Sequence, residues 1–171
     1  YGATECTGAL AYWSAPMDWD KHHSVGKPVF SADMKIVDPE THQEVPAGQR
    51  GEILFSGPQV FNGYWNNPEA TEKAKKDGWY YTGDVGYQDE DGYFFLVDRV
   101  KDMIISGSEN IYPAEIENVI ITIPGVADVG VVGKPDEKWG EIPVAFVVKT
   151  PGTDLNEENI MKTCSENLAK F

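Results

Sequence analysis

Three short segments of the sequence combine residue types that could bind a nucleotide. The first, YGATE at residues 1–5, offers an aromatic ring at Tyr1, a tight backbone at Gly2, a hydroxyl at Thr4 and a carboxylate at Glu5. An aromatic ring suits a nucleobase, a hydroxyl suits a phosphate, and a carboxylate suits Mg²⁺. An ordinary glycine turn has the same composition, so both interpretations stay open for these five residues alone.

The second segment, DVGYQDEDGYFFLVDR at residues 84–99, predicts a β-hairpin with Asp91-Gly92 as a two-residue turn. Counting outward from that turn places Asp84 opposite Arg99, and a bulge would shift the pairing by one place. An Asp carboxylate can accept from both hydroxyls of a ribose while a guanidinium donates to the same oxygens. A cross-strand ion pair is the alternative, and spacing alone favours it.

The third segment, ISGSEN at residues 105–110, places Gly107 and Ser108 shortly before a helix that starts near Pro113. Small residues there could form a concave site where a ligand approaches the backbone closely. A loop that needs a positive φ would look the same. The segment alone favours the loop.

The elements that must position these segments are short. Residues 29–64 predict strands separated by turns, with Ile53 and Phe55 alternating against Glu52 and Leu54. Residues 66–78 predict a helix that Asn67 caps, that has Pro68 in the first helical position and that ends at Gly78.

After Arg99 the pattern changes from strand-rich to mixed. Residues 110–125 predict a helix that ends at Pro124-Gly125, with an apolar stripe of Ile116, Val119, Ile120 and Ile123. Two strands of buried type follow, in VADVGVV and IPVAFVVK. A last amphipathic helix starts near Asn156, which can cap it while Leu155 and Ile160 form a hydrophobic staple. We therefore predict an α+β fold with a domain boundary near residues 99–102.

Composition excludes some classes of function. The hydrophobic content of 41% is that of an ordinary globular protein, and no apolar run is long enough to span a bilayer. The net charge of −14 and the absence of a basic stripe argue against nucleic acid as a partner. Any phosphate must then be held by backbone N–H groups, by a metal, or by cations from elsewhere in the protein.

Cysteine and histidine spacing suggests no further chemistry. Cys6 and Cys164 lie far apart, which indicates free thiols and a reducing, cytoplasmic compartment. His22, His23 and His42 lack the spacing of a metal site and are expected in surface loops. The chain begins without Met, inside the first candidate segment, so we expect it to be a piece of a larger enzyme.

Taken together, the motifs resemble the AMP-forming acyl-CoA synthetases of the adenylating superfamily. YGATE matches Y-G-x-T-E, and GEILFSGPQVFNGYW matches G-E-[LI]-x-x-x-G followed by G-Y. GWYYTGD matches G-W-[FY]-x-T-G-D, and DRVKDMIISGSENIYPAEIE matches D-R-x-K-D-x-I-x-x-G-x-x-N-I-x-P-x-E-[IV]-E. KPDEKWGEIPVAFVV follows P-D-x-x-W-G-E. The five motifs occur in the family's order and cover about two-thirds of the chain.

The resemblance implies a role for each candidate residue and replaces the ion-pair interpretation of the hairpin. Asp84 and Arg99 would bind the ribose of the adenylate, and Tyr1 would pack on the adenine. Gly2 would belong to the same cofactor-binding loop, Thr4 would approach the α-phosphate, and Glu5 would hold Mg²⁺. Lys101 occupies the position of the family's hinge. Gly107 and Ser108 would line the pantetheine tunnel, where the family often has Gly in place of Ser108. Trp139 and Phe171 match positions that contact the nucleotide of CoA in some members.

The resemblance also implies the arrangement of domains. Residues 1–98 would be the end of the large adenylate-forming domain, a distorted barrel-like subdomain, with 99–102 as the hinge and 103–171 as an incomplete small domain. The family's phosphate loop and its terminal Lys-bearing segment would lie outside this chain, so the polypeptide alone is expected to be inactive.

The implied activity joins a carboxylic acid to CoA with ATP and Mg²⁺. The motif DMIISGSENIYPAEIE favours a fatty acid, whereas chain length and the choice between fatty and aryl acids depend on residues outside the chain. Two alternatives stay open: a non-catalytic nucleotide- or CoA-binding module, and an adenylation domain that loads a carrier protein. A homo-oligomer is compatible with the sequence.

Overall fold

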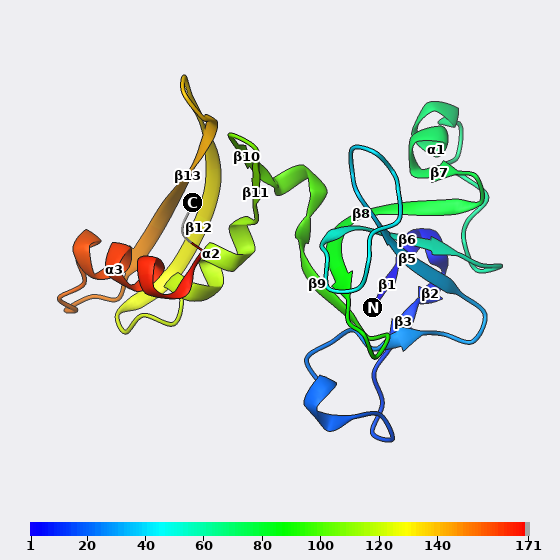
Figure 1. Ribbon diagram of the computed structural model, residues 1–171, viewed down its shortest axis with the longest axis horizontal. Coiled ribbons are helices and arrows are strands. Elements are labelled where there is room, and N and C mark those ends of the chain that lie inside the picture. Colours follow the sequence, from blue (N-terminus) through cyan, green and yellow to red (C-terminus); the bar gives the residue numbers. More distant parts are fainter. Residues whose placement is uncertain (170–171) are drawn as a thin grey trace. The chain divides into compact units, whose positions relative to one another are not determined.

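The computed structural model describes residues 1–169, which divide into two compact units. The first unit is Tyr1–Val100 and the second begins at Lys101, and Figure 1 labels the elements of both. Strands predominate over short helices in the described residues, so the predicted α+β fold class is confirmed.

The first unit is built around a curled antiparallel sheet. Its strands lie in the order β5 (Asp33–Val37), β6 (Gly51–Ser56), β8 (Trp79–Gln88) and β7 (Lys75–Lys76), and β9 (Phe94–Arg99) also pairs with β8. The smaller elements are β1 (Gly2–Ala3) with β2 (Gly8–Ala9), β3 (Ala11–Tyr12) with β4 (Lys27–Pro28), and the 3₁₀ turns η1 (Thr4–Cys6) and η2 (Trp19–Lys21). The core of this unit contains Cys6, Leu10, Ile36, Ile53, Phe55, Tyr80 and Phe94.

The central strand β6 is buried on both faces, which corrects the alternation expected from the sequence. Leu54 and Glu52 are as buried as Ile53 and Phe55 on the opposite face. The strand lies between β5 and β8 in a curled sheet, so neither face is left to solvent. A carboxylate is therefore enclosed in the sheet at Glu52.

Helix α1 (Pro68–Ala74) starts as predicted and ends earlier. The Asn67 side chain accepts a hydrogen bond from the Ala70 amide at 3.1 Å, so the predicted N-cap is confirmed. The predicted end at Gly78 is wrong, because β7 follows the helix directly and pairs with β8. Asp77 and Gly78 instead form the turn between these two strands, both with positive φ (51° and 81°).

The hairpin of β8 and β9 has a different turn from the one predicted and the same pairing at its open end. Three residues lie in the turn, since the Asp89 amide donates to the Tyr93 carbonyl at 2.9 Å and Gly92 has a φ of 83°. The longer turn shifts the register by one residue. A second irregularity between Val85 and Gly86 shifts it back, so Asp84 faces Arg99 as expected.

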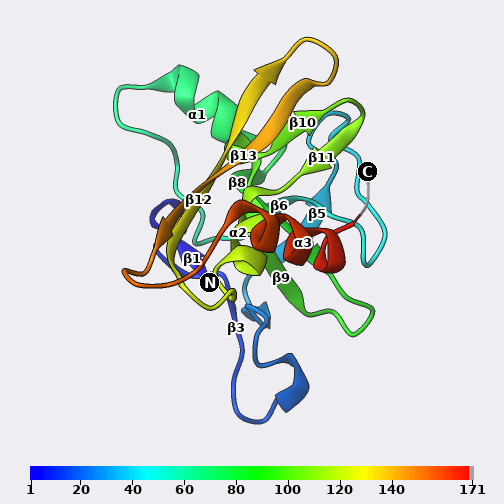
Figure 2. The same cartoon turned by 90° about the vertical axis from the view of Figure 1, so that its left-hand side faces the viewer.

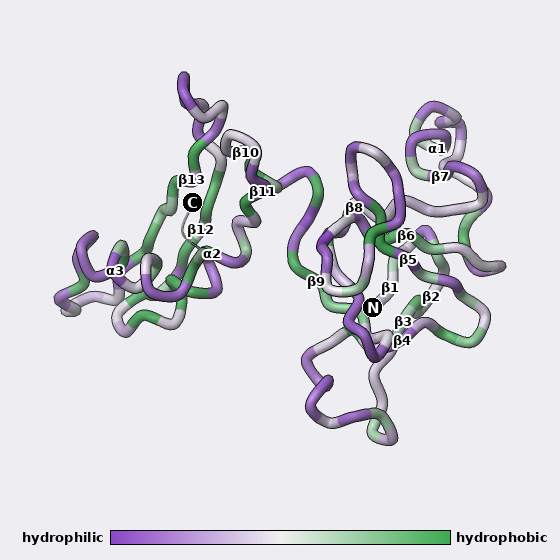
Figure 3. The backbone as a smooth tube through the Cα atoms, in the orientation of Figure 1, coloured by the Kyte–Doolittle hydropathy of each residue, from purple (hydrophilic) through white to green (hydrophobic). Residues whose placement is uncertain are grey.

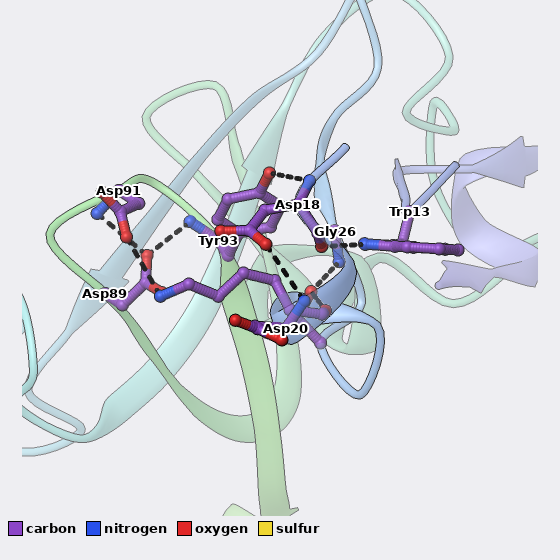
Figure 4. Close-up of polar contacts among 9 residues, drawn as sticks. Trp13, Asp18, Asp20, Gly26, Asp89, Asp91 and Tyr93 are labelled. Carbon is purple, nitrogen blue, oxygen red and sulfur yellow. Dashed lines mark hydrogen bonds and ion pairs between the residues drawn. The ribbon is translucent and has the colours of Figure 1, made fainter. Parts of the chain in front are cut away.

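An ion cluster fastens the hairpin turn to the loop around η2 (Figure 4). The Lys21 ammonium lies 2.6 Å from an Asp89 carboxylate oxygen and 3.0 Å from one of Asp91. The Asp18 amide donates to the Tyr93 hydroxyl at 3.3 Å, and the Lys27 ammonium lies 4.4 Å from the centre of the same ring. These contacts fix the closed end of the hairpin whose open end carries Asp84 and Arg99.

The second unit contains a four-stranded antiparallel sheet in the order β11-β10-β13-β12. A 3₁₀ turn, η3 (Val100–Asp102), precedes β10 (Ile104–Ser106), β11 (Glu109–Ile111) and helix α2 (Pro113–Ile120). The long hairpin of β12 (Val126–Asp136) and β13 (Gly140–Lys149) follows, and helix α3 (Glu157–Asn167) comes last. The Asn156 side chain accepts from the Asn159 amide at 2.9 Å, so the predicted cap of α3 is confirmed.

Both helices of the second unit contact each other beside the long hairpin, as Figure 2 shows. Their shared core consists of Ile120, Ile123 and Leu155, with Ile160 packed against it as the predicted staple requires. Figure 3 shows hydrophobic stretches along both strands of the hairpin. The expectation of fully buried strands is nevertheless wrong, because Val132, Phe146 and Val148 are exposed on the face opposite the helical core.

Replacing Lys21 with Met should lower the thermal unfolding midpoint of the protein at neutral pH. Asp89 carries a lowered pKa because the Lys21 ammonium and the Tyr93 and Asp91 amides outweigh its burial. A carboxyl with a lowered pKa stabilises the fold above its unfolded-state pKa and loses that contribution as pH falls through the folded-state pKa. The difference between wild type and variant should therefore shrink below about pH 4. Unfolding scans across pH measure it.

The matched control is Lys73→Met. Lys73 pairs with Glu69 on α1 at 2.7 Å, but both side chains are more than three-quarters exposed, and such pairs contribute little. Equal effects of the two substitutions at neutral pH would contradict a structural role for the Lys21 cluster.

Candidate nucleotide and CoA sites

The Asp84 carboxylate is the centre of the polar cluster in the first unit. Arg99 Nε forms an ion pair with Asp84 Oδ1 at 2.9 Å, and the Tyr1 hydroxyl donates to Asp84 Oδ2. The Asp84 side chain is 16% exposed, whereas that of Arg99 is 54% exposed. A carboxylate has about four lone-pair positions, so these two partners leave acceptor capacity for a ligand.

Tyr1 fills two roles at once in this cluster. Its ring packs against the core, with its centre 5.7 Å from that of Phe55, and its hydroxyl reaches Asp84. Burial, followed by the hydrogen bond to the Asp84 carboxylate, raises the pKa of the Tyr1 hydroxyl. The hydroxyl therefore stays protonated and acts as a donor at neutral pH.

The rest of the YGATE segment surrounds this pair. Gly2 pairs with Ala9 in the short β1–β2 ladder, and a Cβ at Gly2 would lie 2.5 Å from the Gly8 carbonyl oxygen, so the position has no room for a larger residue. Thr4 begins η1 and is exposed. Glu5 follows it, and its carboxylate accepts from the Tyr64 hydroxyl at 2.8 Å.

Glu5 is ionised at neutral pH. A hydrogen bond from its own amide lowers the pKa of Glu5, burial opposes this, and the Tyr64 hydroxyl and the Arg99 charge lower it further. Tyr64 was missed as a site residue in the sequence, although it stands in the G-Y motif that ends residues 51–65.

Lys101 is the first residue of the second unit and belongs to η3. Its side chain is 74% exposed, and its ammonium lies 3.8 Å from an Asp102 carboxylate oxygen. The predicted hinge residue therefore lies in an exposed segment where the chain passes from one unit to the other.

Ser108 and Trp139, two of the predicted CoA-binding residues, line one groove of the second unit, and Gly107 lies against Trp139. Gly107 and Ser108 form the two-residue turn between β10 and β11, with Gly107 at a φ of 64°. The Gly107 amide donates to the Trp139 carbonyl at 2.6 Å, and a Cβ at Gly107 would lie 3.2 Å from the Trp139 ring. The positive φ that the sequence allowed is present at Gly107, and the Trp139 ring is what lies close to its backbone.

This groove has a volume of about 660 Å³ and is mainly apolar. Ser108 and Trp139 lie at one side and Met161, Cys164 and Leu168 of the α3 region lie at the other. Trp139 is 48% exposed, which leaves much of its indole free to contact a ligand. Phe171, also predicted to contact CoA, lies outside the described residues.

Residues 1–65 match the family described as AMP-binding enzyme, and residues 115–171 match the AMP-binding enzyme C-terminal domain. The chain belongs to the AMP-binding enzyme family. The family resemblance of the motifs is therefore confirmed, on both sides of the segment that contains Asp84, Arg99 and Lys101.

The chain is similar to several larger proteins of this family. YdaB of Bacillus subtilis, which carries the name of an acyl–CoA ligase, and a 2-succinylbenzoate–CoA ligase of Bacillus cereus are both 46% identical to it over all 171 residues. The chain spans about a third of the length of these relatives (34% and 35%).

Solved structures agree with the sequence relatives. The o-succinylbenzoate CoA synthetase of Bacillus subtilis in complex with its acyl-adenylate intermediate has a TM-score of 0.89 and 40% identity. That match covers 99% of this chain and 34% of the other. The same synthetase has been solved with ATP and a magnesium ion, with a TM-score of 0.87 and 39% identity.

Residues 1–169 lack two other kinds of feature. No helix in this range is long and apolar enough to cross a membrane. The same residues contain no cluster of three or more His, Cys, Asp or Glu side chains that could hold a metal ion by themselves.

Replacing Gly107 with Ala should destabilise the second unit by roughly 1–2 kcal/mol, because a Cβ in the left-handed region is strained and here also meets Trp139. Tryptophan fluorescence should shift with the displaced ring. Gly130→Ala is the matched control, since no atom lies within 4 Å of its added Cβ and its φ is not positive. Equal unfolding midpoints for the two variants would show that the Gly107 turn tolerates a side chain.

Proposed function

We propose that this chain is part of an AMP-forming acid–CoA ligase. In the first step the carboxylate of the acid attacks the α-phosphorus of ATP and pyrophosphate leaves. In the second step the CoA thiolate displaces AMP to give the thioester. The observation that carries the proposal is the Asp84 carboxylate held between Arg99 and Tyr1 in a chain of the AMP-binding enzyme family.

Asp84 is suited to bind the ribose of the nucleotide. Arg99 and Tyr1 each occupy one of its oxygens and leave lone pairs for two adjacent hydroxyls. Arg99 and Tyr1 also orient the Asp84 carboxylate before the nucleotide arrives, so this side chain loses little orientational freedom on binding. The half-exposed Arg99 guanidinium can itself donate to the ribose oxygens.

Thr4 and Glu5 are proposed to act at the phosphates. Glu5 is ionised, and Mg²⁺ that is bound through nucleotide phosphates typically needs only one or two protein carboxylates. The single carboxylate at this position therefore fits a magnesium–nucleotide complex. When bound, the ion neutralises phosphate charge, while the Tyr64 hydroxyl keeps the Glu5 carboxylate in place.

The groove beside Gly107, Ser108 and Trp139 is proposed to receive CoA. Gly107 brings the backbone close to the Trp139 ring, and the apolar lining suits the aliphatic part of pantetheine. The names of the relatives support CoA as the acceptor in preference to a carrier protein.

The acid is proposed to be aromatic and of the succinylbenzoate class. Motifs near residues 102–117 favoured a fatty acid, but that preference has no support among the relatives, of which several are named for 2-succinylbenzoate. Pyrophosphate exchange by the full-length enzyme across a panel of fatty and aryl acids tests this choice. A preference for fatty acids would contradict it.

Replacing Asp84 with Ala in the full-length enzyme should lower kcat/KM for ATP by roughly 10–100-fold, the order expected when charged hydrogen bonds worth roughly 1.5–3 kcal/mol are lost. Steady-state kinetics with ATP varied measures the effect. The control is Asp33→Ala, an exposed carboxylate on β5 in the same unit. Unchanged ATP kinetics with lowered stability would show that Asp84 forms only a structural ion pair.

Replacing Lys101 with Pro should separate the two half-reactions. Proline fixes φ near −65° and biases Val100 towards extended conformations. We propose that Lys101 is the hinge for rotation of the C-terminal unit, so a locked hinge spares the half-reaction of one pose. The other half-reaction should fall by about a hundredfold or more.

Pyrophosphate exchange and CoA-dependent thioester formation are measured on the same preparation of Lys101→Pro. Lys101→Ala, which removes the charge and leaves φ free, is the control for domain rotation. Equal loss of both half-reactions, or loss of neither, would place the hinge at another residue.

A further inference from the structure

Strand β8 contains a bulge that includes Asp84. Leu54 of β6 pairs with Tyr81 of β8, whereas Glu52, two residues earlier on β6, pairs with Val85. Ile53 alone therefore faces the three residues between Tyr81 and Val85. Such a bulge redirects side chains and interrupts the backbone ladder, so its amide groups need other partners.

Two buried side chains supply those partners. The Thr82 hydroxyl donates to the Ile53 carbonyl at 2.7 Å and accepts from the Asp84 amide at 3.0 Å. The Glu52 carboxylate accepts from the Gly83 amide at 2.9 Å, and Gly83 has a φ of 71°, which favours glycine. The Thr82 and Glu52 side chains thus hold the backbone of the bulge where the ladder between β6 and β8 is interrupted.

Glu52 is a costly residue to place here. It is 8% exposed, and burial raises the pKa of its carboxyl group, an effect that the Gly83 amide, His42 and Lys76 partly offset. A nearby negative charge at Asp84 adds to the cost. An apolar side chain at this position would avoid both penalties, but it would leave the partly buried Gly83 amide without its acceptor.

We propose that Glu52 is a positioning residue for nucleotide binding, which holds the Gly83 amide so that Asp84 is aimed at the ribose. This inference rests on the proposed function of Asp84. Glu52 acts through the backbone of the bulge and does not contact the nucleotide. Without the acceptor the Gly83 peptide is free to rotate, and Asp84 loses its alignment with Arg99 and Tyr1.

The oxygen of Glu52, more than its charge, is what the bulge requires. Glu52→Gln keeps an oxygen at the same distance from the Gly83 amide, Glu52→Met keeps the length without the acceptor, and Glu52→Asp keeps the charge but withdraws the carboxylate. In the full-length enzyme we expect Met and Asp each to raise the KM for ATP by roughly tenfold, as for one misplaced charged hydrogen bond. The Gln variant should stay within about threefold of wild type.

The preference for ATP over 2′-deoxy-ATP, measured as the ratio of their kcat/KM values, does not change when a variant only loses stability. This preference should fall in Glu52→Met and Glu52→Asp and be retained in Glu52→Gln, because only misalignment of Asp84 weakens recognition of the ribose hydroxyl. In an Asp84→Ala background, Glu52→Met should have little further effect on the KM for ATP, since coupled residues are not additive. Lys21→Met controls for loss of stability in the same unit and should leave the preference unchanged.

Several results would overturn the inference. The inference fails if Glu52→Met or Glu52→Asp keeps the wild-type KM for ATP and the wild-type nucleotide preference. It also fails if the effect of Glu52→Met on the KM for ATP adds fully to that of Asp84→Ala. Rescue by Asp but not by Gln would assign the role to charge. If Asp84→Ala leaves ATP kinetics unchanged, the proposed function and this inference both fail. If Asp84→Ala impairs ATP kinetics and the Glu52 variants do not, only this inference fails. If Glu52→Met does not fold, Glu52→Asp still carries the test.

Discussion

The pairing of the Asp84 carboxylate with Arg99 and Tyr1 is the interaction on which the rest of the first unit depends. It joins the start of the chain to both strands of one hairpin, and it places a partly buried carboxylate beside an exposed guanidinium. The arrangement requires a bulge in β8 and a second irregularity at Val85 and Gly86. Both features depart from a regular sheet, and together they direct the Asp84 side chain.

The second unit organises its groove in a different way. A positive-φ glycine at Gly107 lets the backbone approach Trp139, and helices α2 and α3 pack at one face of the long hairpin. The opposite face leaves Val132, Phe146 and Val148 exposed within the described residues. The first unit thus carries the proposed nucleotide-binding residues and the second carries the proposed CoA-binding residues, with Lys101 where the chain passes between them.

Local chemistry explains which parts of the fold and of the candidate site could be predicted from the sequence. Asn67 and Asn156 cap helices because an Asx side chain acts within three residues, so sequence is sufficient. The pairing of Asp84 with Arg99 was predicted correctly although the predicted turn was wrong. The longer turn and the irregularity between Val85 and Gly86 shift the register in opposite directions, so their effects cancel at Asp84. The burial of Glu52 was missed, since it depends on how the sheet curls and not on alternation along β6. Tyr64 was missed because its partner Glu5 is distant in sequence.

The central claim is that Asp84 is the ribose acceptor of an AMP-binding enzyme. A crystal structure of the full-length enzyme with bound AMP tests it most directly. We expect the Asp84 carboxylate to accept from the 2′ and 3′ hydroxyls at about 2.5–3.0 Å, with Arg99 still paired with it and Tyr1 still donating to it. A ribose bound elsewhere, with Asp84 contacted only by Arg99 and Tyr1, would contradict the account.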